Sequence, residues 1–230
     1  MSTQLIILIT SLVVLLAYKV TAVTYGVYNA YPNSPGGVRF EAEIGSDYTV
    51  ATLSKATNFI WETFQQTENP NDRKPGITRI TVHVVPWKGE VTTKKNQLYI
   101  SSIYIQNYEG DIRREITRVI YHELTHVWQW TGMGRAPKGL LEGIADYVKI
   151  KAGYADEKYG KKQGDGERWD EGAEITAYFL EYCNELRKGF VAELNAKMKN
   201  GYEESFFREL LGKSVEKVWD DYKDKYGHKD

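Results

Sequence analysis

The sequence has little of what several classes of protein require. A single cysteine, Cys183, allows no disulfide within the chain. The 230 residues carry 30 basic and 31 acidic side chains, so no excess of positive charge favours a nucleic acid partner. The chain also has no Asn-x-Ser/Thr glycosylation site and no internal repeat. Its 42% of hydrophobic residues instead indicate a folded globular domain.

One long apolar run is present, at the N-terminus. Residues 4–17 are uncharged and almost all apolar, but the run is too short for a membrane span. Small residues near Ala22 are typical of the cleavage site of a secretory signal. We therefore expect a signal peptide at 1–22 and a single domain at 23–230. The product is expected to be extracellular or apoplastic, without stable membrane association after the signal is removed.

The hydrophobic pattern changes near residue 111. Before it, a helix is predicted at 48–66, and alternating apolar residues predict strands at 37–44, 77–85 and 97–104. After it, apolar residues at helical spacing predict helices at 112–130, 137–153, 173–186, 190–199, 204–211 and 215–226. The sequence therefore predicts an α+β fold with a β-rich N-terminal half and a mostly helical C-terminal half.

The predicted helix at 112–130 contains the motif His-Glu-x-x-His. His122 and His126 are four residues apart, so both imidazoles lie on one helical face and can bind one Zn²⁺. Glu123 is then placed to act on a water at the metal. The alternative is a pair of surface histidines. A carboxylate at position 123, within an apolar stripe, favours a nearby cation because a buried unpaired charge is costly.

A catalytic zinc site requires a third protein ligand. His83 and His228 are remote candidates, whereas the next predicted helix carries Glu142 and Asp146. If the two helices pack antiparallel, Glu142 lies level with His126. Spacing leaves open which carboxylate binds the metal and which orients a histidine. The same acids, with Lys138 and Lys149, also fit the charged stripe of a surface helix.

The segments around this motif resemble the plant basic secretory proteins, a peptidase family related to the zincins. The resemblance rests on HELTHVWQW at 122–130, PKGLLEG at 137–143, IADYVKIKAGY at 144–154, RWD at 168–170 and FVAEL at 190–194. It implies a zincin-like peptidase domain with His122, His126 and Glu142 as metal ligands. It further implies Glu123 as catalytic acid/base, Asp146 as support behind a ligand, and a role in plant defence. Unlike the family name, this chain is not basic.

Together these observations predict a secreted zinc-dependent endopeptidase that hydrolyses peptides or proteins through a metal-activated water. The strand at 97–104, which precedes the motif, is expected to offer its edge to an extended peptide. The alternative is a non-catalytic secreted defence or carbohydrate-binding protein with a vestigial or structural metal site. Its support is the aromatic content, including Trp128, Trp130 and Trp169, because aromatic faces stack on sugars.

Overall fold

The computed structural model of the chain describes residues 22–155 and 160–227. The expected signal peptide therefore lies outside the described residues, except for Ala22. The strands are β1 (Thr24–Asn29), β2 (Arg79–Val85), β3 (Val91–Lys94) and β4 (Gln97–Ser101). The α-helices are α1 (Pro35–Glu43), α2 (Ser46–Thr63), α3 (Ser102–Asn107), α4 (Ile112–Trp128), α5 (Lys138–Lys151), α6 (Ala173–Leu186), α7 (Phe190–Lys197), α8 (Ser205–Leu211) and α9 (Val215–Tyr226). Short 3₁₀ helices are η1 (Pro70–Asp72), η2 (Gly132–Gly134) and η3 (Met198–Asn200).

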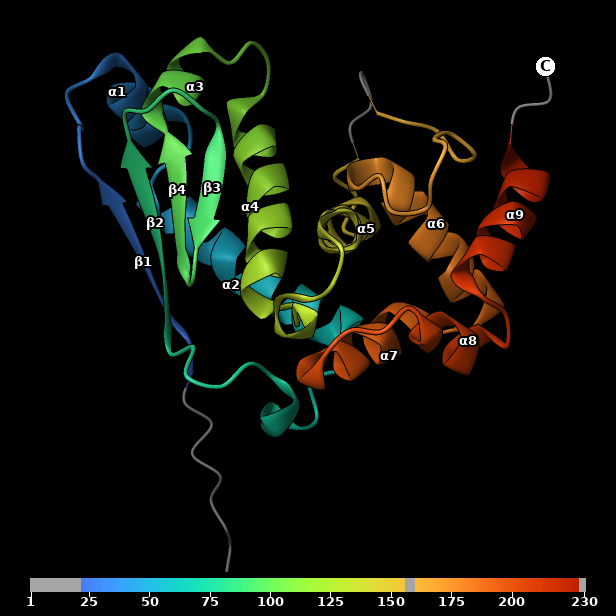
Figure 1. The fold of residues 1–230 in the computed structure, drawn as a ribbon. Helices are drawn as coiled ribbons and strands as arrows, with labels where there is room; N and C mark the ends of the chain where they lie inside the picture. Colours follow the sequence, from blue (N-terminus) through green and yellow to red (C-terminus); the bar gives the residue numbers. More distant parts are fainter. Residues whose placement is uncertain (1–21, 156–159, 228–230) are drawn as a thin grey trace, which may run out of the picture.

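The strands form one four-stranded sheet in the order β1-β2-β4-β3 (Figure 1). β2 is parallel to both β1 and β4, with His83 paired to Tyr28 on one side and to Tyr99 on the other. β3 and β4 are antiparallel and form a hairpin through Lys95 and Asn96. β1 and β3 are the edge strands, and β3 contacts α4.

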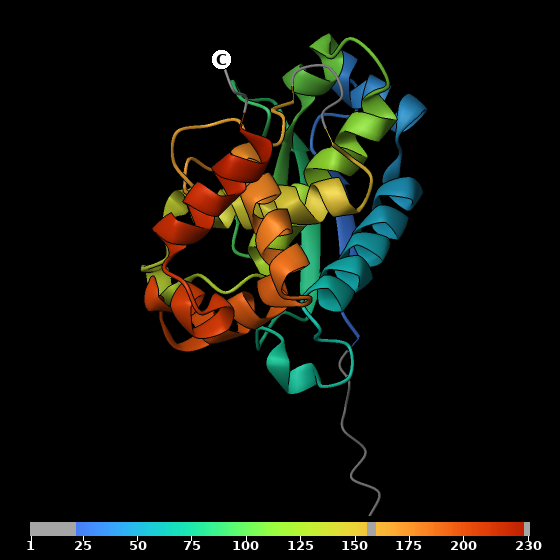
Figure 2. The ribbon, with the colours of Figure 1, turned by 90° about the vertical axis from the view of Figure 1, so that its right-hand side faces the viewer.

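Alternation along the strands directs one face of the sheet toward the core. Ile80, Val82 and Val84 of β2 are completely buried, as are Leu98 and Ile100 of β4. α2 lies behind this face in Figure 1 and packs against β1 and α4. Viewed from the side in Figure 2, α2 (light blue) and the C-terminal helices (orange to red) lie at opposite sides of the molecule.

The strand predicted at 37–44 is wrong, because this segment forms α1. Ser34 caps the helix, its hydroxyl accepting a hydrogen bond from the Gly37 backbone N–H at 3.1 Å, and proline follows at the first helical position. Phe40 and Ile44 are buried four residues apart, whereas Val38 is 54% exposed. The apolar residues of segment 37–44 fit the two-residue period of a strand as well as the period of a helix. The cap formed by Ser34 and the proline after it favours the helix.

Two further features of the first half differ from the sequence prediction. β1 and β3 were not predicted, and the strand expected at 97–104 ends at Ser101, directly before α3 begins at Ser102. Ser101 is the cap of α3, since its hydroxyl accepts a hydrogen bond from the Tyr104 backbone N–H at 3.1 Å. β4 also has both edges paired, with β2 and β3, so it cannot receive a peptide as expected.

The second half is helical as predicted, and the fold is α+β. α6 spans 173–186 and α9 spans 215–226, the ranges expected from sequence. Cys183 is fully buried on α6 and forms no disulfide. Among the described residues, no helix combines the length and apolar character that crossing a membrane demands.

Candidate metal centre

α4 holds the two motif histidines on one of its faces. The helix begins after Asp111, whose carboxylate accepts a hydrogen bond from the Arg114 backbone N–H at 2.9 Å. Its apolar residues are buried in the core and fix its rotation: Ile116, Ile120, Leu124 and Val127. One helical turn separates His122 from His126, and their ring centroids are 4.8 Å apart. The side chains are each about one-fifth exposed.

A tight reversal follows α4 and returns the chain along it as α5. Gln129 already has extended backbone angles (φ −69°, ψ 146°), which ends the helix. Gly132 has φ +61°, and a Cβ there would lie 2.5 Å from the Cβ of Tyr202, so the turn requires glycine. Pro137 then precedes α5, which packs against α4.

The reversal brings Glu142 of α5 to the two histidines. Its Oε2 lies 3.3 Å from Nε2 of His122 and 3.5 Å from Nε2 of His126. The two Nε2 atoms are 3.1 Å apart. The three ligand atoms all lie within 4.8 Å of one another and form a group that could hold a metal ion. This is the clustering expected from sequence.

Asp146 lies on the other side of the His122 ring. Its Oδ1 is 2.6 Å from Nδ1 of His122, so the carboxylate contacts the nitrogen that faces away from Glu142. The geometry thus separates the two acids that spacing left equivalent. Asp146 is also 3.0 Å from the ammonium of Lys149, which lies 3.7 Å from Glu174. Asp146 and Lys149 are 4% and 3% exposed, so they do not belong to a solvated surface stripe.

Gln129 contacts the second histidine and was not identified from sequence. Its terminal amide nitrogen is 2.7 Å from Nδ1 of His126, and its side chain is 1% exposed. The signal that could have found it is its position three residues after His126, at the end of the same helix.

Glu123 is half-buried on α4, directly beside the cluster in sequence but not part of it. Its negative charge contributes to raising the pKa of His122. In the part of the chain that the structure describes, the group of potential ligands comprises two imidazoles and one carboxylate from α5.

The ionisable groups of the cluster shift one another's pKa. Burial lowers the pKa of His122, but hydrogen bonds to Asp146 and Glu142 outweigh burial and raise it to about 9. Hydrogen bonds from both histidines lower the pKa of Glu142. Burial raises the pKa of Asp146, and its contacts with His122 and Lys149 more than reverse this effect. The site therefore favours two negative carboxylates facing a positive group.

The donor set fits a divalent transition metal. Two imidazole nitrogens and one carboxylate oxygen are the protein ligands of one common type of catalytic zinc site, in which the fourth position stays open. Contacts at Nδ1 of both rings leave the two Nε2 atoms to face the same point. His83 does not join the cluster, because it stacks on Tyr99 in the sheet at 5.0 Å. His228 lies outside the described residues.

The chain is similar to known peptidases. A family model described as "Peptidase of plants and bacteria" matches residues 20–222. The chain is also similar to a "Basic secretory protease" from Boswellia serrata, with 42% identity over 59 residues. That match covers 26% of this chain and 67% of the relative. No solved structure matches significantly.

Proposed function

Because the chain belongs to the family of peptidases of plants and bacteria, we propose that it is a zinc-dependent endopeptidase with its active site at the α4–α5 cluster. The observation that carries the proposal is the convergence of His122, His126 and Glu142 within 4.8 Å. In the proposed site these three side chains are the metal ligands. Asp146 holds His122 in the tautomer that presents Nε2. Gln129 lies at Nδ1 of His126 and does the same once its amide is turned so that the oxygen faces the ring.

When bound, Zn²⁺ supplies Lewis acidity toward the scissile carbonyl and lowers the pKa of a water. Glu123 is the proposed acid/base: its carboxylate accepts the proton of the attacking water and delivers it to the leaving amine nitrogen. Lys149 compensates the charge of buried Asp146, so the carboxylate stays ionised and keeps accepting from Nδ1 of His122. No covalent bond between the chain and its substrate is required.

The peptide substrate is proposed to lie along β3. β3 pairs with β4 on one side only, and it contacts α4, which carries the histidines. An extended peptide that hydrogen-bonds to the free edge would therefore run beside the active-site helix. This assignment replaces β4, whose two edges are already paired.

The name of the Boswellia relative, "Basic secretory protease", together with the apolar run at 4–17, supports secretion to the cell exterior. A role in plant defence rests on the resemblance alone. With a formal net charge of −1, such a role would not depend on attraction to anionic surfaces.

The alternative of a carbohydrate-binding protein loses much of its support. Trp128 is 1% exposed and Trp169 is 9% exposed, so both indoles fill the core. Trp130 is half-buried and has the Lys199 ammonium 5.5 Å from its ring. The aromatic content therefore stabilises the fold at these positions, as in other proteins of this composition.

The test is Glu123→Gln, which keeps the size of the side chain and removes its basicity. We expect peptide hydrolysis to fall by about 100-fold or more, the range for loss of a general base. Zinc content, measured by elemental analysis, should stay at the wild-type level because Glu123 is not a proposed ligand. Glu62→Gln, at an exposed position on α2, is the matched control and should keep full activity. Retained hydrolysis in Glu123→Gln would refute the assignment, and hydrolysis insensitive to a chelator would refute the metal.

A further inference from the structure

The first turn of α6 lies directly against the helix that carries the proposed ligand Glu142. A Cβ at Gly172, the residue before α6, would be 3.6 Å from the Cβ of Glu142. Glu174 is in the first turn of α6, and Lys149 is in the last turn of α5. The positive end of one helix dipole favours this carboxylate, and the negative end of the other favours the ammonium. The packing of the two helices therefore brings a charged residue of α6 close to the residues that support the metal centre.

Lys149 lies between two carboxylates inside the protein. Its ammonium nitrogen is 3.0 Å from Oδ1 of Asp146 and 3.7 Å from Oε1 of Glu174. The exposed fraction is 4% for Asp146, 3% for Lys149 and 6% for Glu174. Because solvent scarcely reaches these side chains, it does little to screen their charges. Asp146 and Glu174 therefore share one buried ammonium.

One oxygen of Asp146 contacts two donors. Oδ1 lies 2.6 Å from Nδ1 of His122 and 3.0 Å from the Lys149 ammonium. Because both donors are attracted by the same negative charge, a stronger hydrogen bond from Lys149 leaves a weaker one from Nδ1–H of His122. The partner of Lys149 on its other side therefore influences how well Asp146 supports the histidine.

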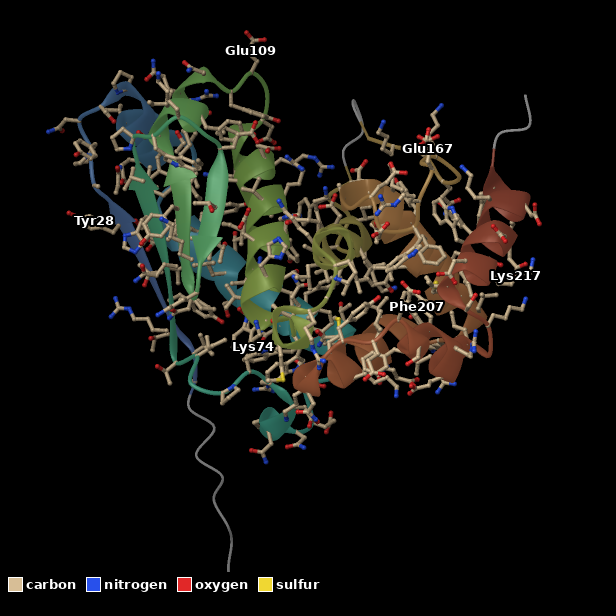
Figure 3. The ribbon with its side chains drawn as sticks, in the orientation of Figure 1. Tyr28, Lys74, Glu109, Glu167, Phe207 and Lys217 are labelled. Atoms are coloured by element: carbon tan, nitrogen blue, oxygen red, sulfur yellow. The ribbon has the colours of Figure 1, made fainter. Side chains whose placement is uncertain are left out.

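That partner, Glu174, is held by the segment that leads into α6. The backbone N–H of Lys161 donates to Oε2 of Glu174 at 2.7 Å, while Oε1 faces Lys149. Lys161 belongs to the segment 160–172, on which Figure 3 labels Glu167. A backbone contact thus fixes the carboxylate of Glu174 opposite the ammonium.

We propose that Glu174 is a positioning residue of the metal centre and acts on His122 through Lys149 and Asp146. This inference rests on the proposed function, because it concerns the affinity of the proposed ligands for zinc. Glu174 attracts the ammonium from the α6 side, so Lys149 compensates the buried charge of Asp146 without occupying the oxygen that His122 needs. Without the Glu174 charge, the ammonium would bind Asp146 more strongly and would be a less compensated positive charge near the metal. Both effects oppose the binding of a dication.

The test is the zinc affinity of Glu174→Gln in the full-length protein, measured at neutral pH by competition with a chromophoric chelator. Glutamine keeps the size of the side chain and an oxygen for the Lys161 N–H, but it removes the charge. We expect zinc binding to weaken by about 3- to 10-fold, less than the roughly 10- to 100-fold typical of losing a direct partner of a ligand. Equal affinity in Glu174→Gln and the wild type would overturn the inference and leave the proposed zinc site standing. A wild type that binds no zinc would overturn both.

The matched control is Glu185→Gln. It removes the same charge at an exposed position about 16 Å further along α6. Zinc affinity in this variant should equal that of the wild type. An equal loss in Glu185→Gln and Glu174→Gln would overturn the inference, since the effect would then follow from net charge alone.

Two further measurements separate positioning from a purely structural role. Glu174→Gln should weaken zinc binding less in a Lys149→Met background than in the wild type, because the ammonium that Glu174 attracts is absent. In zinc-loaded Glu174→Gln, the proton NMR signal of Nδ1–H of His122 should move upfield as its hydrogen bond to Asp146 weakens, whereas that of His126 should stay in place. The same weakening in both backgrounds, or an unmoved His122 signal, would overturn the inference. Should circular dichroism show that Lys149→Met is unfolded, the His122 signal decides.

Discussion

At the scale of single residues, the proposed metal centre depends on the hydrogen-bond partners of the two Nδ1 atoms, which lie on the side of each imidazole that faces away from the metal. A ring that binds a cation through Nε2 carries its proton on Nδ1, and that proton needs an acceptor. His122 has Asp146 as this acceptor. His126 has the amide of Gln129, whose oxygen can take the place of the nitrogen by a half-turn of the amide group.

Replacing Gln129 by Met should therefore weaken zinc binding by about 10- to 100-fold, the usual effect of losing such a partner. Gln129→Glu keeps an acceptor at the same distance and should hold affinity near the wild-type value. Competition with a chromophoric chelator measures both, and circular dichroism checks that the fold is intact. Wild-type affinity in Gln129→Met would show that His126 does not need this contact.

The sequence predicted the residues that meet in the cluster better than the residues that contact them from behind. Two imidazoles at helical spacing and the acids on the next helix are periodic features, so His122 and His126 were grouped in advance with Glu142 and Asp146, while spacing left open which acid faces both rings. The direction of Gln129 follows instead from the extended backbone that ends α4. The burial of Lys149 follows from its packing against Glu174 of α6, which no local pattern contains.

At the scale of helices and strands, α5 packs unusually close to α6. Gly143 is buried between them, and a Cβ at this position would lie 2.3 Å from Cγ2 of Thr176. Thr176 cannot easily move, because its hydroxyl donates to the Trp169 carbonyl and accepts from the Gly172 backbone N–H. This contact fixes how closely α5, the helix that carries Glu142, packs against α6.

Gly143→Ala should consequently lower the free energy of unfolding by about 1–3 kcal/mol, the cost of overpacking a core. The better helix propensity of alanine, worth about 1 kcal/mol, offsets part of this loss. Urea unfolding followed by tryptophan fluorescence measures the change. Asn58→Ala, at an exposed position of α2, is the control and should stay within about 0.5 kcal/mol. A variant as stable as the wild type would contradict the close packing.

The starts of α4 and α5 were predicted to within one residue, at 112 and 137, whereas the helices end at Trp128 and Lys151, two residues before the predicted 130 and 153. Segment 37–44 was predicted as a strand, although it forms α1, because the apolar residues of a short amphipathic segment can fit the period of a strand and that of a helix equally well. β1 was missed for a different reason: it becomes a strand by pairing with β2, more than fifty residues away.

At the scale of the whole molecule, the cluster joins α4, which borders the sheet, to α5, which packs on the C-terminal helices. Without metal, the protonated His122 takes the place of a cation between the two carboxylates. Its pKa is raised from an ordinary 6.5 to about 9 in the folded chain, so its contribution to stability is complete below about pH 6.5. That contribution is lost as the pH rises through about 9.

The chelator-treated protein should therefore become less stable between pH 6.5 and pH 9.5. The zinc-loaded protein should respond in the opposite way, since protons compete with the metal for the imidazoles and the stabilisation by zinc grows with pH. Urea unfolding of both forms across this range measures the two trends. Replacing His122 by Gln should make this loss of stability in the chelated form smaller. Parallel curves for the loaded and chelated proteins would contradict the proposed linkage.

The single sulfhydryl has a practical consequence for the laboratory. Cys183 is completely buried, and burial raises the pKa of its thiol well above the ordinary value. The chain therefore contains no disulfide that a reductant could cleave, and its one thiol is too buried and too little ionised to react with an alkylating reagent. The chain should accumulate correctly folded in a bacterial cytosol, and any inactivation by dithiothreitol would point to removal of the proposed zinc ion.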